Sequence, residues 1–377
     1  MAAVRNAPQR LRRLTPLADA LHQIDRCVAP VAQRFVEITA APNHILAVAD
    51  IAVTEPRPSI PIALRDGWAV RAEATLDASS YAPAVLAQQP LAVQVGDPLP
   101  ANSDAIALPD TVEYRGTLAS AILPVTAGDG VLPQGADASP SEAIFKAGRR
   151  ISWVDVAVLT AIGRDSVSVR QPRVRIAPCR PGDAIIDGIV NLLSGAVAGE
   201  GGIAIKSDPP HASGLDDVLL GKDTDAIIVV GGSGVGERDR SVDALARLGQ
   251  LAFHGIGLTP GETTAFGIAG SCPVLVVPGR LDGALAAWLV LGRYMLSRLR
   301  ACDGEDTIWP VTLTRKITST VGFAEVVVAR REENRAVPLA AGYLSLRALA
   351  GADGWIFVPA DLEGIPADAT VAMKPLP

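Results

Sequence analysis

The sequence is poor in the residues that build metal sites, disulfide frameworks and aromatic stacking surfaces. Its 377 residues include four cysteines and four histidines, and aromatic residues make up 4% of the chain. The cysteines are far apart and form no C-x-x-C pair, which argues against a structural zinc site or a disulfide scaffold and favours a reducing compartment. Because the histidines are equally scattered, a histidine-based metal centre is not expected.

The chain also lacks an excess of positive charge and a long apolar run. A net charge of −6 argues against a nucleic-acid-binding protein, and the shortage of aromatic residues argues against a stacking platform for single strands. The longest apolar helix candidate, residues 284–296, contains Arg293 and is too short to span a bilayer. The arginines near the N-terminus precede no apolar targeting segment. We therefore expect a cytoplasmic protein that binds neither nucleic acid nor membrane.

The most informative stretch is residues 225–239, with the sequence D-A-I-I-V-V-G-G-S-G-V-G-E-R-D. Its apolar run, residues 226–230, is typical of a strand buried on both faces of a parallel sheet. A glycine-rich turn follows, and residues 241–248 have helical spacing. A strand, glycine turn and helix direct backbone N–H groups and a positive helix end at an anion, and the glycines allow close approach. The stretch predicts a phosphate or pterin site, with a tight turn lacking any ligand as the alternative.

Strands and helices alternate from Arg173 to about Ala301, which predicts an α/β domain with a mostly parallel sheet. Two further strand ends, Gly182-Asp183 and Pro278-Gly279, carry glycine near charged residues. Ligands bind outside the carboxyl ends of strands in such sheets. We therefore expect these two turns and the glycine-rich turn to line one cleft.

The remaining segments are mainly of β type. Short strands cut by proline and glycine between about Ala82 and Ala138 predict a small all-β module. Four or five strands after Ile308 predict a small barrel or sandwich at the C-terminus. The expected domains are a discontinuous linker domain of residues 1–70 and 139–172, an inserted β module of residues 71–138, the α/β domain of residues 173–304 and a C-terminal β-barrel of residues 305–377.

Several landmarks occur together in one order. They are the segment Asp66-Gly67-Trp68-Ala69-Val70-Arg71, the inserted β module, the G-G-x-x-V-G-E-x-D loop, Pro260-Gly261, Pro278-Gly279 and the short C-terminal β domain. In this order and spacing the chain resembles the MoeA / gephyrin E-domain family of molybdopterin molybdotransferases from about Leu14 to its end. The resemblance implies an elongated, four-part subunit that forms a homodimer and holds molybdopterin in its α/β domain.

The resemblance also implies a reaction. In the family, adenylated molybdopterin is the substrate, AMP is released, and molybdate supplies the molybdenum that enters the dithiolene with the aid of Mg²⁺. That chemistry needs N–H donors and positive charge around phosphates, carboxylates that hold a divalent cation, and a shaped pocket for the oxyanion. An apo-molybdoenzyme is the implied recipient of the product.

The family motifs carry over to particular residues of this chain. The expected catalytic residues are Asp66, Asp137 and Asp239, and the expected Mg²⁺ ligands are Asp208 and Asp239. For each of these acids a structural role, in a turn or as a helix cap, is the alternative. The expected contacts with the pterin substrate are Gly231, Gly232, Ser233, Gly234, Gly236, Pro260, Gly261, Pro278, Gly279, Arg280 and Asp183.

The chain departs from the family pattern at functional positions. Hydroxyl residues of the family are replaced by Val230, Gly234 and Val95, its acid by Ala184 and its lysine by Glu262. Each lost hydroxyl removes about 0.5–1.5 kcal/mol of net hydrogen bonding, and the acid at 262 replaces a bond worth about 1.5–3 kcal/mol with a repulsion. The residues that could restore positive charge are Arg280, Arg65, Lys206 and Arg238.

Two interpretations of these departures remain open. Either the site is rebuilt and still inserts molybdenum, or the chain is a non-catalytic protein that binds or delivers the cofactor. A phosphohydrolase acting on a different nucleotide is a third alternative, because the α/β domain type is shared widely.

Overall fold

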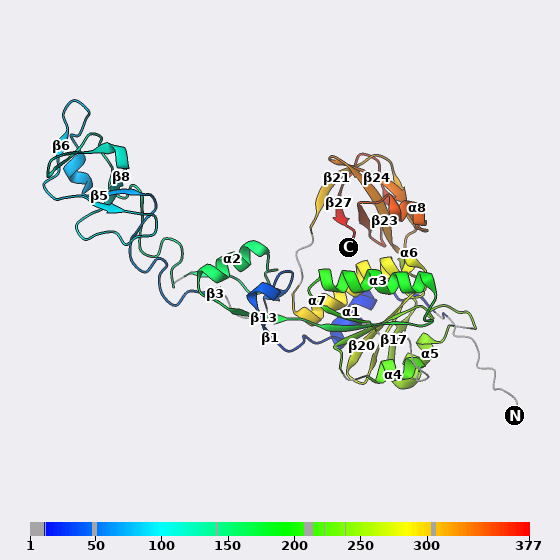
Figure 1. Cartoon of the computed structure of the whole chain (residues 1–377). Helices are drawn as coiled ribbons and strands as arrows, with labels where there is room; N and C mark the ends of the chain where they lie inside the picture. Colours follow the sequence, from blue (N-terminus) through cyan, green and yellow to red (C-terminus); the bar gives the residue numbers. More distant parts are fainter. Residues whose placement is uncertain are drawn as a thin grey trace. The chain divides into compact units, whose positions relative to one another are not determined.

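The computed structural model describes residues 11, 13–46, 51–140, 142–206, 214–221, 223–237, 239–302 and 307–377. The chain divides into two compact units (Figure 1). The larger unit is made of residues 1–48, 148–160 and 164–377, and the smaller unit of residues 49–147 and 161–163. The finer division into four domains stays a prediction.

A six-stranded mixed sheet forms the centre of the larger unit. Four neighbouring strands are parallel, the fifth strand, β19, is antiparallel to them, and the edge strand β17 is antiparallel to β19 and so has the direction of the first four. The predicted α/β domain with a mostly parallel sheet is confirmed. In spatial order the strands are β15 (Ile203–Lys206), β14 (Arg173–Pro178), β16 (Ala226–Val230), β20 (Cys272–Val277), β19 (Ala265–Ala269) and β17 (Gln250–His254).

The apolar run of β16 has no polar alternation because both of its faces are covered. Ile228 packs into one hydrophobic cluster, and Ile227 and Val229 pack into another on the opposite face. The first cluster includes residues of α1 (Leu17–Cys27), α3 (Ala184–Gly199), α6 (Leu281–Ala287) and α7 (Arg293–Arg300), and the second those of α4 (Gly214–Leu220) and α5 (Ser241–Leu248).

The long helix predicted for residues 282–301 is a continuous helical run with one irregularity. The π-helical segment η4 (Trp288–Gly292) separates α6 from α7. The indole of Trp288, which is 1% exposed, lies so close to Gly292 that a Cβ there would be 2.4 Å from the ring. The irregularity thus accompanies a large buried side chain packed on a glycine of its own helix.

A closed five-stranded barrel ends the chain. The pairing of β23 with β25 closes the ring, and β18 (Leu258–Thr259) pairs with β23 and attaches the barrel to the α/β part. The sequence did not show β24, because Pro338 within it breaks the usual strand pattern. The ring order is β23 (Ala324–Glu332), β24 (Arg335–Ala340), β21 (Trp309–Leu313), β27 (Thr370–Pro375) and β25 (Gly354–Val358), with α8 (Leu346–Ala350), β22 (Ile317–Thr318) and β26 (Gly364–Ile365) in the connections.

A smaller sheet precedes the α/β part within the larger unit. It pairs β1 (Arg34–Glu37) and β2 (Ile45–Leu46) with β13 (Ser166–Arg170). The helix predicted near residues 151–163 is α2 (Trp153–Ala161), and the 3-10 turn η1 (Ile38–Ala40) follows β1. No helix in the described part of the chain is long and apolar enough to cross a membrane.

The smaller unit consists of short strands and turns, as the proline- and glycine-rich sequence predicts. Its sheets are small: β5 lies between β7 and β8, β10 lies between β6 and β9, and two further pairs form from β4 with β11 and β3 with β12. The elements are β3 (Ile51–Ala52), β4 (Ile62–Ala63), β5 (Gly67–Val70), η2 (Ala72–Thr75), β6 (Ala84–Val85), β7 (Leu91–Val93), β8 (Ala105–Ala107), η3 (Pro109–Thr111), β9 (Val112–Arg115), β10 (Leu118–Ala121), β11 (Val131–Leu132) and β12 (Ala143–Phe145).

Candidate functional site

Three turns of the chain meet at the carboxyl edge of the parallel strands. Val230, the last residue of β16, pairs with Pro178 of β14 and with Val277 of β20. The segments that follow these residues therefore leave the sheet at the same level. A Cβ built on Gly231 would lie 2.6 Å from Cys179 Sγ and 3.5 Å from Gly279 Cα. The turns that we expected to share one site are thus in direct contact.

The strands β19 and β17 bring two further segments to this edge. Ala265 of β19 pairs with Val276 of β20 and with His254 of β17. Because β17 has the direction of β20, its last residue, His254, lies at the carboxyl edge, and so do the residues just before Ala265. His254 was not singled out from the sequence, although its strand ends at this same edge.

The glycine turn, residues 231–240, depends on two glycines for its path. Gly231 and Gly232 have φ values of +87° and +73°, a region that side chains rarely adopt. A Cβ on Gly232 would also lie 2.2 Å from Ser241 Oγ. Space and backbone conformation therefore both require glycine at these two positions.

Side chains from neighbouring elements hold two carbonyl groups of this turn. Ser241 Oγ donates to the Gly231 carbonyl at 2.8 Å, and His254 Nε2 donates to the Ser233 carbonyl at 2.8 Å. Because C=O and N–H of a trans peptide point in opposite directions, the N–H groups of the next residues are directed away from Ser241 and His254. The two hydrogen bonds thus fix the orientation of two peptide groups of the turn.

The side chain of Ser233 is turned into the protein. Ser233 is 1% exposed, and its Oγ is 2.9 Å from Thr263 Oγ1. Its hydroxyl is engaged with Thr263 and its carbonyl with His254, so Ser233 shapes the turn from inside the protein.

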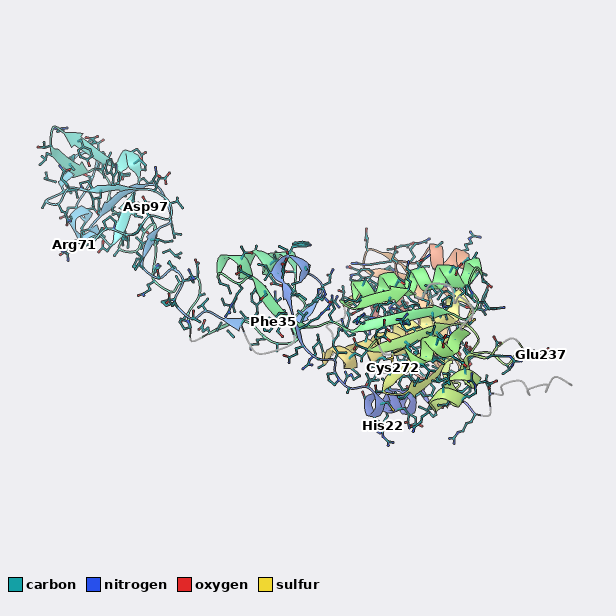
Figure 2. The ribbon with its side chains drawn as sticks, turned by 60° about the horizontal axis from the view of Figure 1, so that its bottom comes forward. His22, Phe35, Arg71, Asp97, Glu237 and Cys272 are labelled. Carbon is teal, nitrogen blue, oxygen red and sulfur yellow. The ribbon has the colours of Figure 1, made fainter. Side chains whose placement is uncertain are left out.

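The carboxylate of Asp239 contacts the backbone of the glycine turn. Its Oδ2 accepts from the Gly236 N–H at 3.2 Å, and a Cβ on Gly234 would lie 2.5 Å from the same oxygen. The following helix, α5, has Arg240 at its N-cap and no side-chain cap hydrogen bond. Asp239 thus contacts the turn itself, while Glu237 lies on the part that projects from the sheet (Figure 2).

The carboxylate of Glu262 accepts two hydrogen bonds within the turn of residues 259–262. Its Oε1 accepts from Thr259 Oγ1 at 2.8 Å and its Oε2 from the Gly261 N–H at 3.1 Å. The Thr259–Pro260 peptide bond in this turn is cis, and Gly261 has a φ of +127°. The negative charge that replaces the family's lysine is therefore hydrogen-bonded within residues 259–262.

Arg280 is paired rather than free. Its guanidinium donates to both carboxylate oxygens of Asp282, at 3.2 and 2.9 Å, and lies 4.9 Å from the ring centre of Tyr343. The hydrogen bond with Asp282 raises the pKa of Arg280 above its already high ordinary value. The positive charge that we expected to compensate for Glu262 is thus balanced by Asp282. Neither Asp282 nor Tyr343 was singled out from the sequence.

Other residues predicted at this edge have structural partners. Asp183 caps α3, since its Oδ1 accepts from the N–H groups of Ile185 at 3.1 Å and Ile186 at 3.4 Å. Lys206 donates to Asn191 Oδ1 at 2.8 Å. Ala184, which stands where the family has an acid, is the first residue of α3.

The remaining predicted acids belong to the smaller unit or lie outside the described residues. Asp66 and Asp137 belong to the smaller unit, where Asp66 Oδ1 accepts from the Val95 N–H at 2.9 Å. Arg65, also in that unit, donates to the Ile106 carbonyl. Asp208 and Arg238 lie outside the described residues, so the structure does not address the roles predicted for them. Among the expected acids that are described, Asp239 is the one whose carboxylate contacts the glycine turn.

The described residues do not form a preformed metal-binding site. Within the described part of the chain, no group of three or more His, Cys, Asp or Glu residues is arranged to hold a metal ion. Mg²⁺ commonly takes only one or two protein carboxylates and completes its shell with phosphate oxygens and water. Asp239 is the described carboxylate that suits this role.

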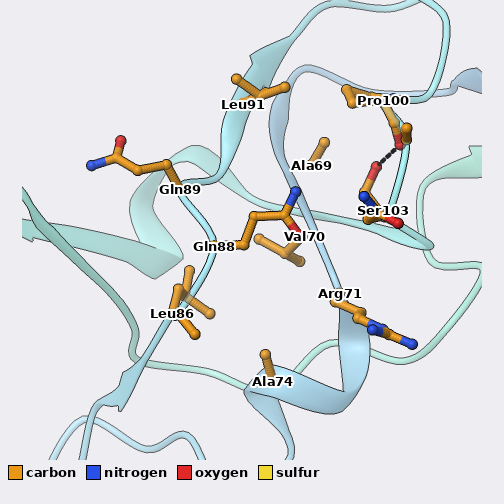
Figure 3. A pocket seen from close by; sticks show the side chains of 13 residues that line it. Ala69, Val70, Arg71, Ala74, Leu86, Gln88, Gln89, Leu91, Pro100 and Ser103 are labelled. Atoms are coloured by element: carbon orange, nitrogen blue, oxygen red, sulfur yellow. Dashed lines mark hydrogen bonds between the residues drawn. The ribbon is translucent and has the colours of Figure 1, made fainter.

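A separate hollow of about 190 Å³ lies in the smaller unit (Figure 3). Arg71, Gln88 and Leu91 line it together with Ser103, whose Oγ donates to the Pro100 carbonyl at 2.5 Å. Pockets that enclose small-molecule ligands measure about 300–1,000 Å³. We assign no ligand to this hollow.

The fold and the turn geometry together define an α/β protein with a glycine turn at the carboxyl edge of its parallel strands. Residues 15–163 match the family described as the MoeA N-terminal region (domain I and II), and residues 212–298 match the family described as a probable molybdopterin binding domain. The chain is a member of the MoeA family.

Individual relatives agree with this assignment. A molybdopterin biosynthesis protein of Methanocaldococcus jannaschii is 25% identical over 364 residues, covering 87% of this chain and 88% of that protein. Molybdopterin molybdenumtransferase 1 of Mycobacterium tuberculosis is 23% identical over 293 residues, covering 71% of this chain and 66% of that protein. The crystal structure of the molybdopterin biosynthesis MoeA protein from Pyrococcus horikoshii shows the same fold, with a TM-score of 0.78, 21% identity and coverage of 96% of this chain and 100% of that chain.

Proposed function

We propose that this protein acts in molybdenum-cofactor biosynthesis, binding adenylated molybdopterin, inserting molybdenum from molybdate and releasing AMP. The observation that carries the proposal is the glycine turn at the carboxyl edge of the sheet, inside the segment that matches a probable molybdopterin binding domain. Relatives named as molybdopterin molybdenumtransferases support the same reaction. They do not favour the alternative of a protein that only binds or delivers the cofactor.

The glycine turn supplies the phosphate-binding surface in this proposal. Gly231 and Gly232, which are buried, set the path of the turn, Ser241 and His254 hold two of its carbonyl oxygens, and the more exposed residues 234–237 would face the phosphate. Asp239 holds the open end of the turn through Gly236. These residues bind and orient the phosphate, so that the dithiolene end of the substrate is presented to molybdate.

Mg²⁺ is the metal that we propose for the reaction. Asp239 would hold it together with phosphate oxygens of the substrate, and the bound ion would supply charge neutralisation at the phosphoanhydride. Asp66 and Asp137 remain our proposed catalytic residues from the smaller unit.

We also propose that the protein acts as a cytoplasmic homodimer and passes its product to an apo-molybdoenzyme. The linker part of the larger unit exposes three large apolar side chains, those of Phe35 at 77%, Trp153 at 68% and Val154 at 71% (Figure 2 labels Phe35). Exposed apolar side chains of this size are typical of protein interfaces. A monomeric mass in light scattering, unchanged by Phe35→Glu, would contradict the dimer.

The test of the main proposal is AMP release from adenylated molybdopterin by the purified protein, with Mg²⁺ and molybdate present. We expect molybdate-dependent release that Asp239→Asn reduces strongly and that Asp361→Asn, on an exposed residue of the barrel, leaves unchanged. Transfer of active cofactor to an apo-molybdoenzyme is the second readout. Binding without release would show a cofactor-holding protein, and neither binding nor release would overturn the proposal.

A further inference from the structure

Arg280 and Tyr343 form a stacked pair from distant parts of the chain. Arg280 follows β20 of the α/β part, and Tyr343 lies between β24 and α8 of the barrel. The guanidinium lies 4.9 Å from the centre of the tyrosine ring. Two planar groups of opposite electronic character, a cation and a π face, thus lie against each other.

The pair is held in place although it is open to solvent. The Arg280 side chain is 67% exposed, whereas its partner Asp282 is 6% exposed and also accepts from the Gly283 N–H at 2.9 Å. Tyr343 is 60% exposed, and the next residue, Leu344, anchors the segment at 2% exposure. Burial of apolar area therefore does not explain the pair, because both side chains remain more than half exposed.

The pair begins at the rim of the glycine turn. A Cβ on Gly279 would lie 3.4 Å from Gly231 Cα, and Arg280 is the next residue along the chain. Arg280 thus follows directly on a residue that packs against the glycine turn, and Tyr343 stacks on Arg280. A planar cation and an aromatic ring therefore start one residue away from the contact with the turn.

We propose that the Arg280–Tyr343 pair is a stacking surface for the planar nitrogen heterocycle that the substrate carries beyond its phosphate. The proposal rests on the proposed function, because it concerns the same site. The shared chemistry is a flat, nitrogen-containing ring joined to phosphate, which both adenine and a pterin provide. Tyr343 and Arg280 would act as specificity-determining residues, since stacking selects flat rings while the glycine turn recognises phosphate alone.

Binding measurements with three probes test this proposal. The dissociation constants of AMP, molybdopterin and pyrophosphate are measured for the wild type and for Tyr343→Ala, Tyr343→Phe and Arg280→Lys, with quenching of pterin fluorescence as a direct sign of stacking. We expect Tyr343→Ala to weaken binding of the stacked ligand about tenfold, within the range known for base–aromatic stacking. Tyr343→Phe keeps the ring and should stay within about twofold. Arg280→Lys, which keeps the charge but loses the planar group, should fall between the two.

Pyrophosphate and a matched tyrosine provide the controls. Pyrophosphate has no ring, so Tyr343→Ala should leave its affinity unchanged, and Tyr81→Ala, on a side chain that is 98% exposed in the smaller unit, should change nothing. A selective loss for AMP would identify adenine as the stacked ring, and a selective loss for molybdopterin would identify the pterin. Equal losses for pyrophosphate and the ring ligands, or no loss at all while the wild type binds them, would overturn the stacking surface and leave the proposed function standing. A wild type that binds none of the probes would overturn both.

Discussion

Restoring the serine that the family carries at position 234 should weaken phosphate binding in this chain. The Cβ of a residue at 234 would lie 2.5 Å from Asp239 Oδ2, whereas ordinary contact begins at 3.4 Å. The carboxylate would have to move by about 1 Å, since real atoms do not approach so closely. Its bond to the Gly236 N–H is already long at 3.2 Å, so this displacement breaks it.

The magnitude follows from the lost hydrogen bond. A charge-assisted bond is worth about 1.5–3 kcal/mol, and partial exposure of Asp239 reduces this to about 1 kcal/mol. The expected result is about a fivefold increase in the dissociation constant of adenylated molybdopterin or pyrophosphate for Gly234→Ser. Isothermal titration calorimetry measures it, with circular dichroism as the check on folding.

Gly234→Ala is the matched control for this prediction. Gly234 does not have the positive φ of Gly231 and Gly232, so a Cβ here acts through Asp239 and not through backbone strain. Both variants should therefore lose affinity by similar factors. Binding by Gly234→Ser that equals or exceeds the wild type would refute the reasoning, because it would show that the hydroxyl restores more than the displaced carboxylate contributed.

Three further substitutions test separate parts of the structure. His254→Phe removes the donor to the Ser233 carbonyl and should weaken pyrophosphate binding about fivefold, a loss of about 1 kcal/mol, whereas unchanged affinity would show that the turn holds itself. Asp183→Ala should lower the free energy of unfolding by about 1 kcal/mol in urea through loss of the α3 cap, and Asp183→Asn should retain most of it. Glu200→Gln should cost about 3 kcal/mol, since it leaves the charge of Arg300, 3% exposed, without its carboxylate partner. Burial alone would raise the pKa of Glu200, but the neighbouring arginines hold it below its ordinary value of 4.5. The stabilising effect of Glu200 is therefore present above pH 4.5 and is lost as the pH falls through the lowered pKa. If the free energy of unfolding of Glu200→Gln fell at acidic pH in the same way as that of the wild type, this explanation would be contradicted.

The regular part of the fold was predictable from local patterns. The unbroken apolar run of β16 gave its bounds and its central place, because a strand covered on both faces needs no polar alternation. The helix α5 was equally clear from its spacing. By contrast, β24 was missed because Pro338 and small residues hide its pattern. The π-helical segment was missed because its cause is a packing contact of Trp288 with Gly292 and not a periodicity.

The site was predictable only as far as backbone motifs reveal it. The meeting of the three turns followed from parallel strands ending at one edge, a rule that needs no side chains. His254 and Tyr343 were not found, since the end of β17 and the attached barrel bring them to this edge from positions without any motif. The partners of Glu262 and Arg280 were not found either. The partner of a charged side chain depends on distances of a few ångströms in the folded protein, and these distances cannot be read from the sequence.

The two charges that distinguish this chain from the family pattern have different surroundings. Glu262 accepts from Thr259 Oγ1 and from the Gly261 N–H, which are neutral donors and leave its negative charge in place. Arg280 donates to both carboxylate oxygens of Asp282, and a paired charge has a weaker field than an isolated one. In the proposed function, phosphate binding at this edge therefore depends mainly on the backbone of the glycine turn.

Val230 shows how such an arrangement tolerates the loss of a serine. The residue is 0% exposed and belongs to the same hydrophobic cluster as Val277 and Ile186. In this chain, position 230 is part of the core, where a hydroxyl without a partner would cost stability. The glycine that follows it, Gly231, retains the turn regardless of what the strand ends with. The conformation of the turn therefore does not depend on the side chain at the end of the strand. This chain keeps the glycine turn of the family while it replaces the serine before the turn with a core valine.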